Sequence, residues 1–167
     1  RELVISGGGI KTFSYTNLYI CESFIINGPT VDNSIHNNRI TLAGSFTLLA
    51  GSFKSGTGSN ATLVFGGTAL QALTGSFTGD SKLNNINLDN AAGLTLAGDV
   101  TMAGLLTLSS GRITTGVGNF TMEVAATATP AAVPATARSS MISSRVSQLE
   151  YPAHYGHNTR PAALSRP

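Results

Sequence analysis

Three aspartates in the middle of the chain have the residue type and spacing that catalysis could use. Asp80, Asp89 and Asp99 follow one another at intervals of nine or ten residues. Glycoside hydrolysis requires a pair of carboxylates, one of them acting as an acid and the other as a base or a nucleophile. Asp80 and Asp99 each follow a glycine, however, and aspartate is common in turns without any catalytic role. We therefore assign no catalytic residue, and a polysaccharide-cleaving site stays as an alternative.

Two histidines near the end of the chain have a spacing that could bind a metal. His154 and His157 are three residues apart, which on a helix places both side chains on one face. Pro152 disfavours a helix there. The sequence contains one other histidine, His36. Cys21 is the single cysteine, so a cysteine-based zinc site and an intramolecular disulfide are both excluded. We expect no bound metal and no cofactor, and we expect Cys21 to be a small buried apolar side chain.

The composition of the 167-residue chain excludes several classes of protein. Charged residues make up 11% of the chain, whereas about 25% is usual for soluble domains. The net charge is +2 and lysine and arginine form no cluster, which argues against a nucleic-acid-binding protein. No apolar run is long enough to cross a membrane as a helix. Hydrophobic residues reach 41%, so disorder along the whole chain is excluded as well.

The composition changes sharply near Met122 and predicts two parts. Residues 1–122 contain 18 of the 19 glycines and all seven phenylalanines, whereas residues 123–167 contain five of the six prolines. Pro130 and Pro134 disfavour both a long helix and a paired strand. We predict a folded part over residues 1–122 and an Ala/Pro/Arg-rich, disordered tail over residues 123–167. A short helix over residues 139–149 is the alternative within that tail.

The first part contains seven triplets in which a threonine lies between two apolar residues. Alternation with a period of two predicts short strands that bury the outer residues and expose the threonine. Threonine is β-branched and suits such a position. The triplets are residues 40–42, 46–48, 61–63, 94–96, 100–102, 106–108 and 120–122.

Apolar residues also recur at intervals of 23 or 24, as in the series Leu42, Phe65 and Leu88. A period in this range indicates stacked repeats, and repeats made of strands indicate a β-solenoid. A β-sandwich is the competing architecture, but the triplets between residues 94 and 108 are only six residues apart, which is too close for its hairpins. We predict an all-β parallel β-helix (β-solenoid) of about five coils with a disordered C-terminal tail.

Polar residues of the repeats suggest two further interpretations. Asn84, Asn85, Asn87 and Asn90 predict a structural ladder of stacked turn amides. The outward threonines allow a minor alternative function, because regular ranks of threonine on a flat face can bind ice. The intervals between successive triplets vary from six to thirty-three residues, so a regular array of threonines is not expected.

Residues 84–116 resemble a segment that recurs in large secreted repeat proteins of Bacteroidetes. The resemblance is carried by Asn84-Asn85 before a short strand, by residues 90–93 (Asn-Ala-Ala-Gly) and by the two Leu-Thr-Leu triplets that follow. It covers about residues 1–122 and implies a right-handed parallel β-helix, exported to the cell surface, with an adhesin-like or structural role. The family continues with further coils and often a C-terminal sorting domain. The tail departs from that pattern, and we interpret the chain as a fragment whose tail is out of frame.

Together these observations predict a non-enzymatic structural or adhesive surface protein, secreted or at the cell surface. Its Thr-, Ser- and Asn-rich faces would contact extracellular glycans or neighbouring solenoid coils, with weak affinity because exposed aromatic rings for stacking are scarce. Nucleic acid is not expected as a partner, and no membrane span is expected. The alternative is a remnant of a polysaccharide-cleaving β-helix enzyme, and ice binding is the minor alternative.

Overall fold

The computed structural model describes residues 2–14 and 17–130, which form short strands joined by turns. A single turn of 3-10 helix, η1 (Gly79–Ser81), follows the eighth strand. Burial alternates along most strands, which is the period-two pattern of the triplets. The strands are β1 (Leu3–Ser6), β2 (Ile10–Thr12), β3 (Asn17–Ile20), β4 (Phe24–Asp32), β5 (Arg39–Leu42), β6 (Phe46–Lys54), β7 (Thr62–Phe65), β8 (Gln71–Thr74), β9 (Asn85–Asp89), β10 (Leu94–Ala97), β11 (Val100–Met102), β12 (Leu105–Ser110), β13 (Ile113–Thr115), β14 (Phe120–Met122) and β15 (Thr127–Pro130).

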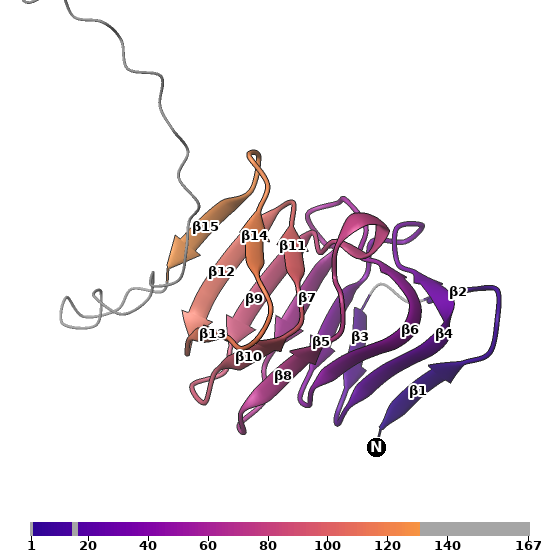
Figure 1. Cartoon of the computed structure of the whole chain (residues 1–167), viewed down its shortest axis with the longest axis horizontal. Coiled ribbons are helices and arrows are strands. Elements are labelled where there is room, and N and C mark those ends of the chain that lie inside the picture. The colour runs from indigo at the N-terminus through magenta and orange to yellow at the C-terminus, as the bar shows by residue number, and fades with distance from the viewer. Residues whose placement is uncertain (1, 15–16, 131–167) are drawn as a thin grey trace, which may run out of the picture.

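Every pairing between these strands is parallel and joins one turn of the chain to a neighbouring turn. The first sheet has the order β1-β4-β6-β8-β10-β13, with β2 beside β4. The second sheet has the order β3-β5-β7-β9-β12-β15, and β11 pairs with β14 on a third side. Figure 1 shows the strands of successive turns lying side by side along the molecule. The chain is therefore an all-β parallel β-solenoid, which confirms the fold predicted from the repeats.

The solenoid has about six turns, one more than the repeat period predicts. Both large sheets contain six strands along their main path. The turns differ in length, because the step from Phe46 to its partner Leu73 is much longer than the step from Leu94 to its partner Ile113. The sixth turn arises because some turns are shorter than the period of the buried series and because β15 follows the expected end of the fold.

Phenylalanines of successive turns fill the centre of the solenoid. Phe24 and Phe46 occupy paired positions on β4 and β6, and their rings stack with centroids 4.6 Å apart. The ring of Phe46 also meets those of Phe53 and Phe77, at 5.2 and 5.0 Å. All four side chains have no exposed surface. Complete burial of such a side chain stabilises a fold by about 1.5–3 kcal/mol, so this stack is a main source of cohesion between the turns.

The threonine triplets have the orientation that their alternation predicts. Ile40 and Leu42 are fully buried and Thr41 between them is partly exposed. Leu94 and Leu96 are likewise buried on either side of a partly exposed threonine. The burial weakens in the last described turn, where 36% of Met122 is exposed, because β13 and β14 pair on one side only within residues 2–14 and 17–130.

Glycines stack at one corner of the solenoid, where the backbone of one turn lies directly on the next. A Cβ atom on Gly98 would collide with the carbonyl oxygen of Gly75, and one on Gly118 would collide with the carbonyl oxygen of Gly98. Parallel strands lie only about 4.8 Å apart, which leaves no room for a side chain between stacked turns of backbone. These three glycines are therefore required by close approach.

The folded part extends past residue 122, which corrects the predicted boundary. Thr127–Pro130 forms β15 and pairs in parallel with β12, with Thr127 opposite Leu105. Pro130 is compatible with pairing because β15 is an edge strand, whose outward N–H groups need no partner. The rest of the predicted tail, residues 131–167, lies outside the described residues, and so does the alternative helix over residues 139–149.

The expectation that Cys21 is buried is wrong, because its side chain is exposed. Ile20, at the end of β3, faces the core and is 4% exposed. Cys21 follows it directly and leads into the turn before β4, so the alternation of the strand directs its side chain outward.

Candidate functional site

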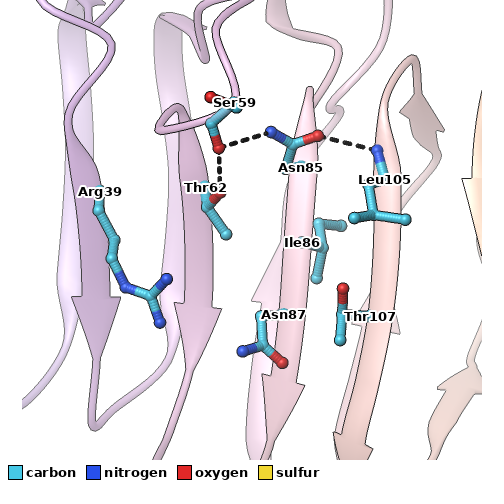
Figure 2. Close-up of a pocket in the computed structure, with 8 residues that line it drawn as sticks. All are labelled: Arg39, Ser59, Thr62, Asn85, Ile86, Asn87, Leu105 and Thr107. Atoms are coloured by element: carbon cyan, nitrogen blue, oxygen red, sulfur yellow. Dashed lines mark hydrogen bonds between the residues drawn. The ribbon is translucent and has the colours of Figure 1, made fainter. Parts of the chain in front are cut away.

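A hollow of about 330 Å³ lies on the outer face of the second sheet and is shown in Figure 2. We call it the second-sheet hollow. Its walls come from β5, β7, β9 and β12 and from the turn before β7. The lining residues are Arg39, Ser59, Thr62, Asn85, Ile86, Asn87, Leu105 and Thr107.

The parallel register explains why these particular residues share one face. Thr62 pairs with Asn85, and Asn87 pairs with Thr107. Arg39 immediately precedes Ile40, which pairs with Leu63, so Arg39 lies beside Thr62. Successive side chains of a strand point to opposite faces, and the burial of the intervening apolar residues leaves these polar ones outside. The hollow is thus built from side chains whose positions are set by the backbone ladder of four successive turns.

The upper rim of the hollow is held by hydrogen bonds of Asn85. Its side-chain amide donates to the carbonyl oxygens of Gly58 and Ser59, at 3.2 and 3.3 Å, and its side-chain oxygen accepts from the backbone N–H of Leu105 at 2.8 Å. The hydroxyl of Thr62 donates to the same carbonyl oxygen of Ser59 at 3.2 Å. Figure 2 shows this chain of bonds running from β7 across β9 to β12. The hydrogen-bonding groups of Asn85 are therefore used within the protein and are poorly suited to a ligand.

Three other lining groups remain available to a ligand. The side-chain oxygen of Asn87 accepts from the hydroxyl of Ser109 at 2.9 Å, which leaves its NH₂ group unused within residues 2–14 and 17–130. The hydroxyl of Thr107 makes no hydrogen bond there either, and the Arg39 guanidinium has neither a hydrogen bond nor an ion pair to a described residue. In Figure 2 the Arg39 side chain extends from β5 toward β7.

A second hollow, of about 240 Å³, lies at a corner of the solenoid. We call it the corner hollow. Lys54, Asp80 and Lys82 contribute its charges. Lys82 also forms an exposed ion pair with Glu123 at 2.9 Å, a type of pair that contributes little to stability. The remaining lining residues are Ser34, Ser55, Gly56, Thr57 and Gly79.

Asp32 lies next to the corner hollow and is held by its neighbours. Its carboxylate accepts hydrogen bonds from the hydroxyl and the backbone N–H of Ser34 and lies 3.8 Å from the ammonium of Lys54. The hydroxyl bond is the largest influence and lowers the pKa of Asp32. Burial acts in the opposite direction, but the backbone bond and the charge of Lys54 add to the lowering, so the pKa of Asp32 lies below its usual value.

The three aspartates singled out in the sequence lie in different parts of the turns and do not line one common hollow. Asp80 is in η1 and lines the corner hollow. Asp89 ends β9, where its carboxylate accepts from the hydroxyl of Ser110 at 3.1 Å. Asp99 lies in the turn before β11 and accepts from the backbone and the side chain of Asn119, at 2.8 and 3.2 Å. These bonds give Asp89 and Asp99 structural partners in the next turn of the solenoid.

Asparagines predicted to form a structural ladder of turn amides bond to residues of neighbouring turns. Asn90 is buried, and its side-chain amide donates to the carbonyl oxygen of Ala69 and to the side chain of Gln71, at 2.7 and 2.9 Å. Asn84 donates to the carbonyl oxygen of Gly58 at 3.0 Å. The Asn90–Gln71 bond joins two side-chain amides of successive turns, and the other bonds go from an amide to the backbone of the preceding turn.

The structure offers no support for a metal site among the residues that it describes, since no group of three His, Cys, Asp or Glu side chains could hold an ion there. His36 is exposed. His154 and His157 lie outside the described residues, so the prediction about them stays untested.

Threonines on the two large sheets do not form long ranks. Thr47 pairs with Thr74, and Thr95 pairs with Thr114. Beyond each of these pairs the column continues with another residue type; Ala97, for example, lies beside Thr74. Within the described strands, no column of either large sheet carries threonine through more than two successive strands, which gives the ice-binding alternative no supporting geometry.

Comparison of the chain with protein-family models, with curated proteins and with solved structures finds no match in any of the three. The parallel β-solenoid is therefore the part of the Bacteroidetes resemblance that the structure supports. The helices of the described residues include none with the length and apolar character that crossing a bilayer requires.

Sequence reasoning missed Arg39 and the grouping of the lining residues into one hollow, although a signal for that grouping was present. Arg39, Thr62 and Asn85 follow one another at the same interval as the buried series Leu42, Phe65 and Leu88. The apolar positions drew attention to that period. The polar residues that share this period lie on the opposite face of the same strands.

Proposed function

We propose that this chain is a non-enzymatic structural or adhesive protein that holds glycans on the outer face of its second sheet. The observation that carries the proposal is the second-sheet hollow, whose lining includes hydroxyl, amide and guanidinium groups on strands of four successive turns. Such groups exchange hydrogen bonds with the hydroxyls of sugars. Because the parallel strands already position them, binding would require little ordering of the protein.

We expect each contact with a glycan to be weak. None of the eight lining residues of the hollow is aromatic, so a sugar ring has no flat apolar surface on which to stack. Useful attachment would then depend on several weak contacts at once, along a long polysaccharide or through many copies of the protein. This mode of binding suits an adhesive or structural protein better than a receptor for one small molecule.

A glycan-binding role suits a secreted or cell-surface protein, which is also what the resemblance of residues 84–116 implies. The partners would be extracellular glycans or neighbouring solenoid coils. Both present many polar groups, which the hydroxyl, amide and guanidinium groups of the second-sheet hollow can meet.

The proposal is tested by incubating the full chain with a panel of insoluble polysaccharides and measuring the retained fraction together with any reducing ends released. We expect retention on at least one polysaccharide and no release of reducing ends. Thr107→Val removes an unused hydroxyl from the hollow and should reduce retention. Thr121→Val removes a hydroxyl of another exposed threonine, on β14, and should leave retention unchanged. Absence of retention on every polysaccharide would contradict the proposal.

The alternative function, cleavage of a polysaccharide, is favoured by one observation only. Asp80 lines the corner hollow together with Lys54 and Lys82, and a carboxyl group in a cleft can act as a general acid or base. Release of reducing ends by the full chain, abolished by Asp80→Asn, would favour this alternative over a purely adhesive role.

A further inference from the structure

The hydrogen-bonding capacity left open in the second-sheet hollow consists mainly of donors. The Arg39 guanidinium offers five N–H groups and no acceptor, and the Asn87 amide offers its NH₂ group because its oxygen already accepts from Ser109. The Thr107 hydroxyl can donate or accept. The acceptor at the rim, the side-chain oxygen of Asn85, is engaged by the N–H of Leu105. A ligand rich in acceptors is therefore the one that this hollow suits.

The charges on this face favour the same kind of ligand. Arg39 is the one charged residue among those that line the hollow, and no carboxylate lines it. Within the strands of the second sheet that the structure describes, the other charged residue is Asp89, at the far end of β9 and bonded to Ser110. The positive charge of Arg39 is thus neither paired with a described carboxylate nor offset by an acid in the hollow.

From these two observations we propose that the second-sheet hollow binds an acidic sugar, whose anionic group is held by the Arg39 guanidinium. This inference rests on the proposed function. A planar guanidinium matches the two oxygens of a carboxylate, or of a sulfate ester, with a pair of parallel hydrogen bonds. Asn87 and Thr107, on the neighbouring strands β9 and β12, then bond the ring oxygen and hydroxyls of the same sugar or the next one.

The size of the hollow fits a short stretch of a glycan chain. Its volume of about 330 Å³ is at the lower end of the range for ligand pockets. It crosses from β5 to β12, which are three strand spacings apart, or roughly 14 Å. A glycan chain lying across the strands would place one acidic residue over Arg39 and continue toward Thr107.

The proposal is tested by titrating the isotope-labelled full chain with small probes and following backbone and side-chain amide signals by NMR. The probes are trigalacturonic acid, its neutral counterpart galactotriose, galactose 6-sulfate and inorganic sulfate. We expect trigalacturonic acid to shift the signals of Thr62, Asn87 and Thr107 and to bind about tenfold more tightly than galactotriose, as one charge-assisted pair would produce. Galactose 6-sulfate distinguishes sulfate esters from carboxylates as the preferred group.

Two variants with the same loss of charge separate this site from general attraction of anions. Arg39→Gln should weaken the binding of trigalacturonic acid by about tenfold and leave the affinity for galactotriose unchanged. Arg112→Gln removes another exposed arginine, in the turn before β13, and should leave both affinities unchanged. Arg39→Lys keeps the charge but loses the paired geometry, so it should recover only part of the affinity. Arg39 is exposed and unbonded to the described residues, so the variants should keep the circular dichroism spectrum of the parent chain.

Several outcomes would overturn the inference. Equal affinity for the acidic and neutral sugars, unaffected by Arg39→Gln, would reject it while leaving the proposed glycan-binding function intact. If Arg39→Gln and Arg112→Gln weaken the binding of trigalacturonic acid equally, the net charge of the chain alone attracts the acidic sugar. Binding of inorganic sulfate as tightly as trigalacturonic acid would show an anion site without sugar recognition. Absence of binding by all the sugars, together with absence of retention on polysaccharides, would reject the proposed function as well.

Discussion

At the scale of single residues, the polar side chains of this solenoid mostly bond to the turn before or after their own. Asn90, for instance, is 1% exposed, and its side-chain NH₂ group donates to Ala69 and Gln71 of the preceding turn. Gln71, one turn earlier, bonds back to the carbonyl oxygens of Leu42 and Gly44. A buried polar group is costly unless it is bonded, and these two side chains satisfy each other and the backbone at the same corner.

Replacing Asn90 tests how much this corner contributes to stability. Asn90→Ala should lower the free energy of unfolding by about 2–3 kcal/mol, because buried partners such as the carbonyl oxygen of Ala69 lose their donor. Asn60→Ala is the matched control, since Asn60 is an exposed turn residue, and it should change stability by less than about 0.5 kcal/mol. Urea unfolding followed by circular dichroism measures both. Equal effects of the two substitutions would contradict this account of the corner.

Asp32 predicts a dependence of stability on pH. Its pKa is lowered in the folded chain, chiefly by the hydroxyl of Ser34, so folding favours the ionised carboxylate. The resulting stabilisation is present above the pKa of the unfolded chain, about 3.9, and is lost as the pH falls through the lower pKa of the folded state. Asp32→Asn removes this titrating group, so the difference in stability between the parent chain and the variant should shrink as the pH is lowered from neutral to about 2.

Unfolding in urea at a series of pH values measures this effect. Asp80→Asn is the control, because Asp80 is exposed and its carboxylate makes no hydrogen bond to a described residue. If the difference in unfolding free energy between the parent chain and Asp32→Asn stays constant with pH, Asp32 contributes through packing alone and not through its charge.

At the scale of elements, the corners between strands restrict the sequence more tightly than the strands do. A strand needs only apolar residues on its inner face and polar residues on its outer face. A corner where two turns of backbone touch tolerates no Cβ atom, as at Gly98, which lies between Gly75 and Gly118. Such stacked glycines set how closely one turn approaches the next.

Gly98→Ala should therefore destabilise the chain, by about 1–3 kcal/mol, because the added methyl group meets the carbonyl oxygen of Gly75. Gly8→Ala is the matched control: no atom lies within 4 Å of the position that its Cβ atom would take, and its backbone is not in the left-handed region. It should be neutral or slightly stabilising, since alanine restricts the unfolded chain. Thermal unfolding of the two variants beside the parent chain gives the comparison, and a neutral Gly98→Ala would show that the corner can widen.

At the scale of the whole molecule, stability is shared between neighbouring turns. Among the described residues each turn pairs with the turns on either side, so the first and last described turns have one neighbour where the central ones have two. The burial pattern follows this arrangement, since Phe65 in the middle has no exposed surface whereas Phe120 in the last complete turn is only partly buried. The ends should consequently open more readily than the centre.

Hydrogen exchange measured on the native full chain tests this gradient. Backbone amides of β5, β7 and β9 should be the most protected, and those of β13, β14 and β15 should exchange faster. The variant Phe46→Ala leaves a cavity in the central stack and should lower the free energy of unfolding by about 3–5 kcal/mol. Hydrogen exchange across the middle turns should become faster as a result. Uniform protection from β1 to β15 would instead show that the turns unfold as one unit.

The sequence by itself determined the fold class, the alternation of the strands and the approximate period. These follow from local rules, because side chains alternate along a strand and stacked turns repeat their apolar positions, as Leu42, Phe65 and Leu88 do. Their burial is confirmed. Residues such as Thr41, between buried neighbours, were also placed on the correct face for this reason.

Only the tertiary structure decided which polar residues meet. The length of a turn varies along the solenoid, so spacing in the sequence alone does not say that Asn90 bonds to Gln71 or that Arg39 shares a hollow with Thr107. The same holds for β15, whose pairing depends on the free edge of β12 rather than on its own composition. Contacts between distant turns depend on the accumulated length of every loop between them, and local patterns do not contain that sum.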